Sequence, residues 1–126
     1  MNKKIKIAFD LDEVICKRPK NLENLGVDKY QHCRPIKKNI DLINKLYDKN
    51  FFIMIYTSRG MTQFNANIKL IKKKLQKLTL NQLKKWGVKY DRFCMGKLHY
   101  DLLIDDKAIN SKGVKLKDIK NILNFK

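Results

Sequence analysis

The sequence has few of the features that mark disordered or membrane-spanning chains. Its 126 residues include two prolines and five glycines, and no repeat, low-complexity tract or proline-rich linker interrupts them. No apolar run approaches the roughly 18 to 20 residues that span a bilayer. The basic start lacks the long apolar region and cleavage site of a signal peptide. Because 44% of the residues are hydrophobic, we expect one globular cytoplasmic domain over residues 1–126.

Cysteine is also scarce and carries no pairing pattern. Cys16, Cys33 and Cys94 are an odd number without a CxxC spacing, so we expect reduced thiols and no disulfide framework. A zinc site needs close ligand pairs, and adjacent residues such as His32 and Cys33 are a poor chelating pair.

Acidic residues are few: 12, against 29 basic residues and a net charge of +17. Only four of the basic residues are arginine and 25 are lysine. Nucleic-acid binding proteins rely on arginine forks and exposed aromatic side chains, so this composition argues against a nucleic-acid partner. The positive field favours a small phosphorylated substrate, and nothing indicates a membrane partner.

Apolar runs alternate with amphipathic stretches along the chain. Continuous apolar runs indicate buried strands, and apolar residues three or four positions apart indicate helices. A helix can start near Pro35, Thr79 can cap a short helical continuation, and Gly87 is a fitting helix stop. We expect strands at residues 4–9, 51–56, 90–95 and 102–104, helices after Pro35, across Phe64 to Leu75 and within 114–126, and a polar flap at 13–34. Strands that alternate with helices predict a parallel, doubly wound α/β sheet.

Four polar clusters follow the predicted strands or their flanking turns. The carboxyl ends of parallel strands share one edge of a sheet, where ligands bind. We therefore expect all four clusters to converge on one site: Asp10 with Asp12, Thr57 with Ser58 and Arg59, Lys97, and Asp105 with Asp106.

The residue types in these clusters suit phosphoryl transfer. Neighbouring carboxylates repel unless a cation holds them, and oxygen ligands favour Mg²⁺. One carboxylate can attack phosphorus and form an aspartyl-phosphate. A second, placed by a turn, can give and take a proton. A hydroxyl and a lysine complete the phosphate cradle.

The motifs FDLDEV, IYTSRG, Gly96-Lys97 and LLIDDKA resemble, in order and spacing, motifs I to IV of the haloacid dehalogenase superfamily. More narrowly, TSRGM followed by WGVKYDRFCMGKLHYDLLIDDKAIN is similar to small capsule-biosynthesis phosphatases. The resemblance implies a three-layer, Rossmann-like (HAD-like) parallel sheet with helices on both faces. It also implies a phosphatase, with a sugar phosphate of surface-polysaccharide (capsule) synthesis as its substrate.

The resemblance implies a role for each matching residue. Asp10 matches the nucleophile and Asp12 the general acid/base. Thr57 and Lys97 match the phosphate-binding hydroxyl and lysine. Asp10, the Asp12 main-chain carbonyl, Asp105 and Asp106 match the magnesium ligands, with Asp105 expected to bind directly and Asp106 through water. We expect Ser58 and Arg59 to add contacts to the substrate or its phosphate.

Two departures from the family pattern stand out. Glu13-Val14 replaces the usual glycine and threonine after the second aspartate, and Leu98 replaces the proline of motif III. The intervals from Asp12 to Thr57 and from Thr57 to Lys97 have no room for a separate cap domain. We therefore expect an open site that the 13–34 flap or a neighbouring subunit can cover, and capless relatives favour a homo-oligomer.

Simpler interpretations exist for each cluster. Asp10 and Asp12 can be turn residues, Thr57 and Ser58 can cap a helix, and Asp105 with Asp106 can be a charged loop. His32 and His99 are expected at the surface, and Trp86, Phe51, Phe52 and Phe93 in the core. Two other functions stay open: a phosphatase for nucleotides or nucleic-acid ends, and a non-catalytic basic binding module with the same fold.

Overall fold

The computed structural model describes residues 5–125, and residue 4 of the first predicted strand lies outside this range. Its main sheet has three parallel strands in the order β1-β4-β5. These are β1 (Lys6–Asp10), β4 (Phe52–Thr57) and β5 (Arg92–Met95). Three of the four predicted strands are therefore confirmed.

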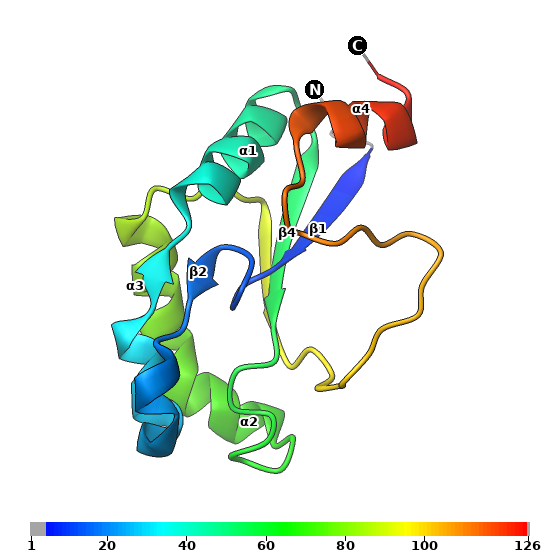
Figure 1. The fold of residues 1–126 in the computed structure, drawn as a ribbon. Coiled ribbons are helices and arrows are strands. Elements are labelled where there is room, and N and C mark those ends of the chain that lie inside the picture. Colours follow the sequence, from blue (N-terminus) through cyan, green and yellow to red (C-terminus); the bar gives the residue numbers. More distant parts are fainter. Residues whose placement is uncertain (1–4, 126) are drawn as a thin grey trace.

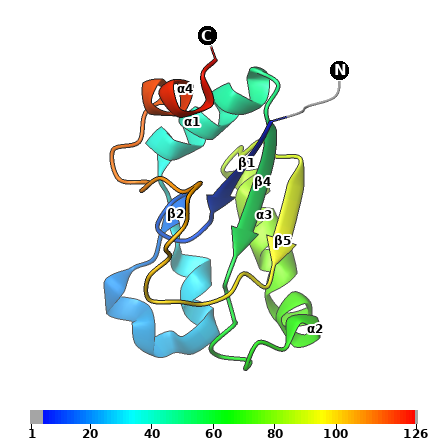
Figure 2. The ribbon, with the colours of Figure 1, turned by 90° about the vertical axis from the view of Figure 1, so that its right-hand side faces the viewer.

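The helices lie on two sides of this sheet. Figures 1 and 2 show α1 (Lys37–Asp48) and α3 (Lys77–Lys85) on one side and α4 (Leu116–Leu123) on the other. Both crossovers, β1 to β4 and β4 to β5, advance in the same direction across the sheet, so right-handed connections put their helices on the same face. The chain is an α/β protein with a small parallel sheet. Every helix within residues 5–125 is too short or too polar to cross a membrane.

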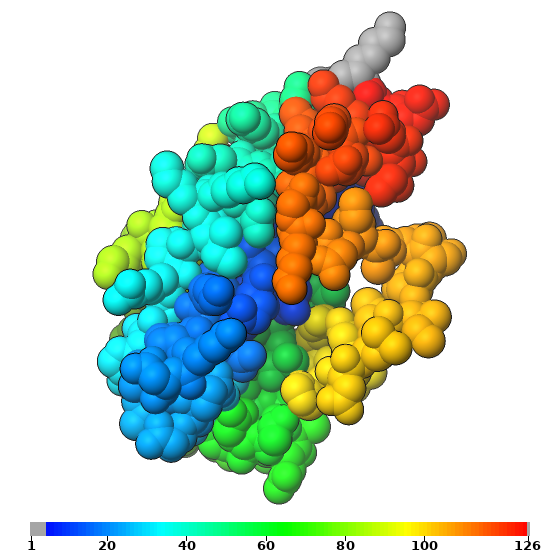
Figure 3. Space-filling view, in the orientation of Figure 1, coloured from blue at the N-terminus to red at the C-terminus, as the bar shows by residue number. Residues whose placement is uncertain are grey.

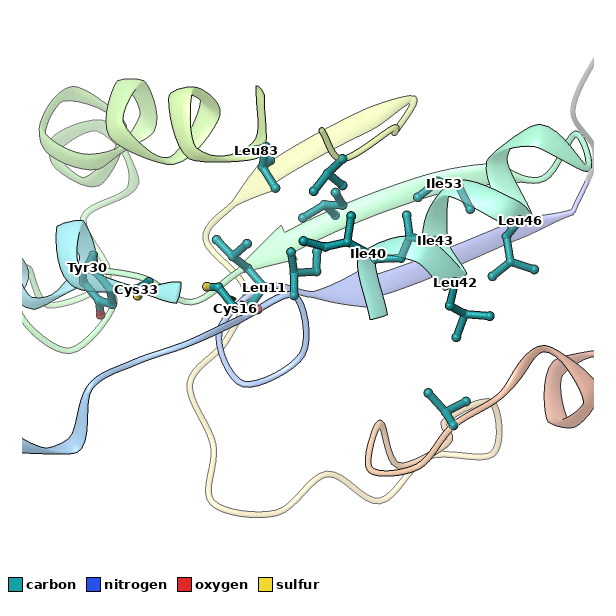
Figure 4. Packing of buried hydrophobic residues seen from close by; sticks show 14 of the residues in the cluster. Leu11, Cys16, Tyr30, Cys33, Ile40, Leu42, Ile43, Leu46, Ile53 and Leu83 are labelled. Atoms are coloured by element: carbon teal, nitrogen blue, oxygen red, sulfur yellow. Dashed lines mark hydrogen bonds between the residues drawn. The ribbon is translucent and has the colours of Figure 1, made fainter. Parts of the chain in front are cut away.

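The core is built where the strands meet the first of these helical layers. Alternate residues of β4, among them Ile53 and Ile55, are fully buried. Ile43 and Leu46 of α1 are also fully buried against them (Figure 4). Burying an aliphatic side chain of this size stabilises the fold by about 1.5–3 kcal/mol. This packing fixes β1 and β4 side by side and thereby sets the position of the residues that follow them.

A continuous helical segment connects β4 to β5. It consists of α2 (Ile68–Ile71), a π-helical turn η2 (Lys72–Gln76) and α3. The side chain of Asn67 accepts a hydrogen bond from Leu70 N (3.1 Å) and caps its start. Gly87, with φ of +69°, follows its end. Thr79 lies inside this segment, so the prediction that it caps a short helical continuation was wrong.

The predicted flap is more ordered than its sequence indicates. It contains β2 (Cys16–Lys17) and 3₁₀-helical turns η1 (Lys20–His32), and it ends in β3 (Arg34–Pro35). β2 and β3 form an antiparallel ladder that pairs Cys16 with Pro35. The two ends of the flap are therefore held together by backbone hydrogen bonds.

The fourth predicted strand is not formed. Residues 101–105 have no ladder partner, and Leu102, Leu103 and Ile104 are 77%, 44% and 90% exposed. Figure 3 shows this part of the chain within an exposed arm, residues 98–110, that is yellow and orange and stands away from the body. The predicted C-terminal helix is confirmed as α4, where Asp118 accepts a hydrogen bond from Lys115 N (2.8 Å).

Candidate active site

Asp10 is the last residue of β1 and lies at the carboxyl edge of the sheet. Its Oδ1 accepts a hydrogen bond from Leu11 N (2.8 Å). Its Oδ2 lies 3.1 Å from the Lys97 Nζ, although the two residues are 87 positions apart in the sequence. The sheet therefore brings together two of the predicted site residues.

Lys97 is positioned by the strand beside it. Its backbone N donates to Thr57 O (3.0 Å), which extends the β4-β5 pairing by one step. The Nζ lies between the rings of Tyr56 and Tyr100, 4.9 and 4.5 Å from their centroids, and donates to the Tyr100 hydroxyl (2.8 Å). Burial alone would lower the pKa of Lys97, but the Tyr100 hydrogen bond and the Asp10 carboxylate outweigh it and raise that pKa.

Thr57 ends β4 next to Lys97 and is 1% exposed. Its hydroxyl oxygen accepts a hydrogen bond from Arg59 N (3.1 Å). This bond holds the turn after β4 and leaves the hydroxyl its own proton to donate. Ser58 is half-buried, and its carbonyl accepts from Met61 N (3.0 Å) in the same turn.

Arg59 binds both carboxylate oxygens of Asp12. The Arg59 Nη2 lies 2.9 Å from Asp12 Oδ1, and the Nε lies 3.0 Å from Oδ2. The Arg59 side chain is 0% exposed and that of Asp12 is 15% exposed. Each guanidinium nitrogen is used, because Nη1 also donates to Gln82 Oε1 (2.6 Å) and Thr79 Oγ1 (3.2 Å).

This geometry differs from the expectation that Arg59 contacts the substrate. The guanidinium is buried against Tyr30, with its Cζ 4.8 Å from the ring centroid, and its donors are bonded to protein groups. Burial by itself would lower the pKa of Arg59, but the hydrogen bonds to Asp12 and its charge raise it. In this structure Arg59 holds Asp12 in position.

Two thiols complete the surroundings of this ion pair. The sulfurs of Cys16 and Cys33 lie 3.4 and 3.7 Å from Asp12 Oδ1. Each sulfur also lies 3.5 Å from Arg59 Nη2. The interaction between the two neighbouring thiols raises the pKa of Cys16 and lowers that of Cys33.

Asp105 and Asp106 lie on the exposed arm described above. The Asp105 Oδ1 accepts from Lys107 N (2.8 Å), and this backbone hydrogen bond lowers the pKa of Asp105. Both aspartates line a cavity of about 810 Å³ that Asp10, Lys97 and Tyr100 also line. The cavity is lined by residues of β1, β4, α4 and the arm.

The expected magnesium ligands are of the type that Mg²⁺ prefers, but they are not gathered around one point. Carboxylate oxygens from Asp10, Asp105 and Asp106 face one cavity, and Mg²⁺ prefers such ligands. They do not form a tight group, however. Within residues 5–125, the acidic, cysteine or histidine side chains whose ligand atoms all lie within 4.8 Å of one another are Asp12, Cys16 and Cys33.

Glu13 lies in the turn after Asp12, at a position where glycine would be favoured. Its φ is +69°, a left-handed conformation that costs a non-glycine residue about 1–2 kcal/mol. Its exposed carboxylate accepts from Arg18 N (3.3 Å) and lies 3.6 Å from Arg18 Nε. The side chain thus turns toward the flap.

Several residues around the site were not predicted from the sequence. Tyr30, Tyr56, Tyr100, Thr79 and Gln82 contact Lys97 or Arg59. One clue was present, because Thr79 and Gln82 are polar residues three apart, a spacing that puts them on one face of a helix.

Comparison of the sequence with protein-family models and with curated proteins gives no match. Among solved structures, the chain is similar to a crystal structure of an MCSG target from Vibrio cholerae. The TM-score is 0.78 and the identity 23%, and the match covers 96% of this chain and 98% of that one. The similarity therefore shows that this fold occurs in a solved structure along nearly the whole chain.

Proposed function

We propose that the protein is a magnesium-dependent phosphomonoesterase of the haloacid dehalogenase type. The single observation that carries the proposal is the contact between Asp10 Oδ2 and Lys97 Nζ, 3.1 Å, at the carboxyl edge of a parallel sheet. This edge is where open α/β sheets bind ligands. Thr57 at the end of the neighbouring strand is 1% exposed and does not line the cavity, so its hydroxyl would act as a donor for the phosphate only after the turn that follows it moves.

Asp10 is the proposed nucleophile. One of its carboxylate oxygens attacks phosphorus, a new bond forms between that oxygen and phosphorus, and the bond from phosphorus to the ester oxygen breaks. Lys97 and the Thr57 hydroxyl stabilise the charge on the transferring phosphoryl group. Because the pKa of Lys97 is raised, its side chain stays a cation at neutral pH.

Asp12 is the proposed proton donor to the leaving oxygen, and afterwards the base for the attacking water. In the described conformation both of its oxygens contact Arg59. Asp12 does not line the cavity that contains Asp10. The proposal therefore requires the Asp12 side chain to rotate away from Arg59 when substrate binds.

Asp10, the Asp12 carbonyl, Asp105 and Asp106 would hold the magnesium ion. When bound, the ion would neutralise the carboxylates and polarise the phosphate oxygens. The arm that carries Asp105 must approach β1 for these oxygens to gather. Its exposure and its lack of ladder partners make that movement inexpensive.

The substrate class follows from size and from resemblance. A cavity of 810 Å³ is of the size that holds a small metabolite. The resemblance to capsule-biosynthesis phosphatases favours a sugar phosphate, which would be cytoplasmic in such a pathway.

The proposal is tested with purified protein, a generic aryl phosphate and Mg²⁺. Hydrolysis should require Mg²⁺, and Asp10→Asn should abolish it. Equal rates of hydrolysis in the two proteins would overturn the assignment of Asp10 as the nucleophile, and no hydrolysis by the wild type would favour a non-catalytic binding module. A phosphate-release screen over sugar phosphates and nucleotides then identifies the substrate. Activity on nucleotides or DNA ends alone, falling steeply with salt, would overturn the sugar-phosphate assignment.

A further inference from the structure

The buried group formed by Asp12, Cys16, Cys33 and Arg59 is not used by the proposed reaction beyond Asp12 itself. Two thiols from opposite ends of the flap meet there, and their sulfurs lie within 4.8 Å of each other. Figure 4 shows the two cysteines at the same end of the buried cluster, next to Leu11 and Tyr30. Such a pair can hold a metal ion or form a disulfide.

The charges argue against a metal ion. A metal ligated by both sulfurs and Asp12 Oδ1 would lie about 2.0–2.3 Å from each of them. The Arg59 Nη2 is already 2.9 Å from that oxygen and 3.5 Å from each sulfur. The guanidinium thus occupies the position of the cation, and a second cation beside it would be repelled.

The position of the two cysteines allows a disulfide. β2 and β3 pair Cys16 with Pro35, and Cys33 lies two residues before that proline. Side chains two residues apart on a strand share one face of a ladder, so Cys33 is the diagonal neighbour of Cys16. Diagonal neighbours lie at or beyond the usual Cα separation of a disulfide, so the backbone of the flap must shift before the two sulfurs can bond.

We propose that Cys16 and Cys33 are a redox-modification site, in which hydrogen peroxide joins the two sulfurs in a disulfide that displaces Asp12. Cys33 is 8% exposed and Cys16 is 0% exposed, so peroxide reaches Cys33 first. Its thiol becomes a sulfenic acid and one water is released. The Cys16 sulfur then attacks the Cys33 sulfur, and a second water leaves. Two thiols are oxidised and one peroxide is reduced.

Formation of the disulfide would disturb Asp12 in two ways. A disulfide has no S–H group, so Asp12 Oδ1 loses both thiol neighbours as hydrogen-bond donors. Movement of Cys16 also pulls on the turn that carries Asp12, because Glu13 N donates to Cys16 O (2.7 Å). The effect on catalysis rests on the proposed phosphatase function, whereas formation of the disulfide does not.

A peptide map tests the disulfide without any activity measurement. Reduced native protein is treated with peroxide or buffer, free thiols are alkylated after unfolding, and tryptic peptides are analysed by mass spectrometry. The three cysteines fall in separate tryptic peptides, 7–17, 30–37 and 93–97. Peroxide should link 7–17 to 30–37 and leave 93–97 unlinked, and a thiol reductant should reverse the link. Full alkylation of all three peptides after peroxide would overturn the proposal, as would a link to 93–97.

Variants separate this pair from general oxidation. Cys33→Ser should prevent the link, whereas Cys94→Ser, the matched control, should keep it. With aryl phosphate, peroxide should lower the activity of the wild type and of Cys94→Ser about tenfold, relative to each protein's own reduced state. The Cys33→Ser ratio should stay near one. A linked wild type with unchanged activity would overturn the displacement of Asp12. A reduced wild type without any activity would instead overturn the proposed function, and the peptide map would still decide the disulfide.

Discussion

Arg59 binds Asp12 through two nitrogens, with Nη2 at 2.9 Å from Oδ1 and Nε at 3.0 Å from Oδ2. The pair joins the turn after β4 to the turn after β1, the two segments that directly follow Thr57 and Asp10. The Arg59 side chain is fully buried, so its positive charge is stabilised by the Asp12 carboxylate and by the polar residues of α3 in place of water. The two site-forming turns are therefore held together by one buried ion pair.

Removal of this arginine should destabilise the fold strongly. Arg59→Met keeps the length of the side chain but leaves Asp12 and Gln82 without their partner, so we expect a loss of about 3 kcal/mol in the free energy of unfolding. Urea unfolding measures it. The exposed Arg34 provides the control, because Arg34→Met should change the value by less than about 0.5 kcal/mol. Similar losses in both variants would show that the ion pair contributes no special stability.

Gly60 tightens the same turn and should not tolerate a side chain. Its φ is +79°, and a Cβ there would lie 2.8 Å from a Leu75 methyl carbon, 3.1 Å from Phe64 and 3.2 Å from Ile71. Gly60→Ala should cost roughly 3 kcal/mol, from backbone strain and overpacking together.

Gly113 separates these two causes. Its φ is +70°, but nothing lies within 4 Å of the added Cβ. Gly113→Ala should therefore cost about 1 kcal/mol, the backbone strain alone. Equal losses for the two alanine variants in urea unfolding would mean that the crowding around Gly60 is relieved without cost.

The Lys97 side chain should stay protonated above its ordinary pKa of 10.5. A raised pKa in the folded state means that the cation stabilises the fold below the unfolded pKa. This contribution is lost as the pH rises through the folded pKa. A ¹³C NMR titration of the Lys97 Cε should therefore have its midpoint above pH 10.5.

Asp10→Asn removes the carboxylate from this contact and should lower the Lys97 midpoint. Asp48→Asn is the matched control, because Asp48 pairs with Lys89 at 2.9 Å and not with Lys97. A midpoint that is the same in Asp10→Asn and the wild type would contradict the 3.1 Å contact at the centre of the proposed site.

The parts of the fold that the sequence predicts are those with a strong hydrophobic period. β4 alternates buried and half-buried residues, and α1 buries one face, so neither needs knowledge of a distant partner. The 3₁₀ turns of the flap lack such a period. Their backbone departs from helical angles at Leu22 and Gly26, which is why the segment resembles an irregular loop in sequence.

Most side-chain contacts of the site could be identified only from the tertiary structure. Thr57 and Lys97 could be predicted to meet because both follow strands of one parallel sheet. Arg59 could not be assigned to Asp12 from sequence, since the contact depends on the conformation of the turns after β1 and β4 and on how α3 packs. At Leu102 to Ile104 a strand was predicted that does not form. Three apolar residues in a row suit a strand, but they do not ensure a neighbouring strand with which to pair.

The exposed arm, residues 98–110, gives the sharpest test of the magnesium site. Its residues 101–105 have no ladder partner in the structure, so their amides should exchange with solvent far faster than those of β4. If Asp105 and Asp106 bind the ion together with Asp10, Mg²⁺ should draw the arm toward β1 and slow that exchange. Hydrogen exchange read by mass spectrometry measures both states on a peptide from this arm.

Asp105→Asn with Asp106→Asn should remove the effect of Mg²⁺, whereas the exposed Asp101→Asn should keep it. Exchange that is equally fast with and without Mg²⁺, in a protein whose phosphatase activity requires the ion, would place the magnesium ligands elsewhere.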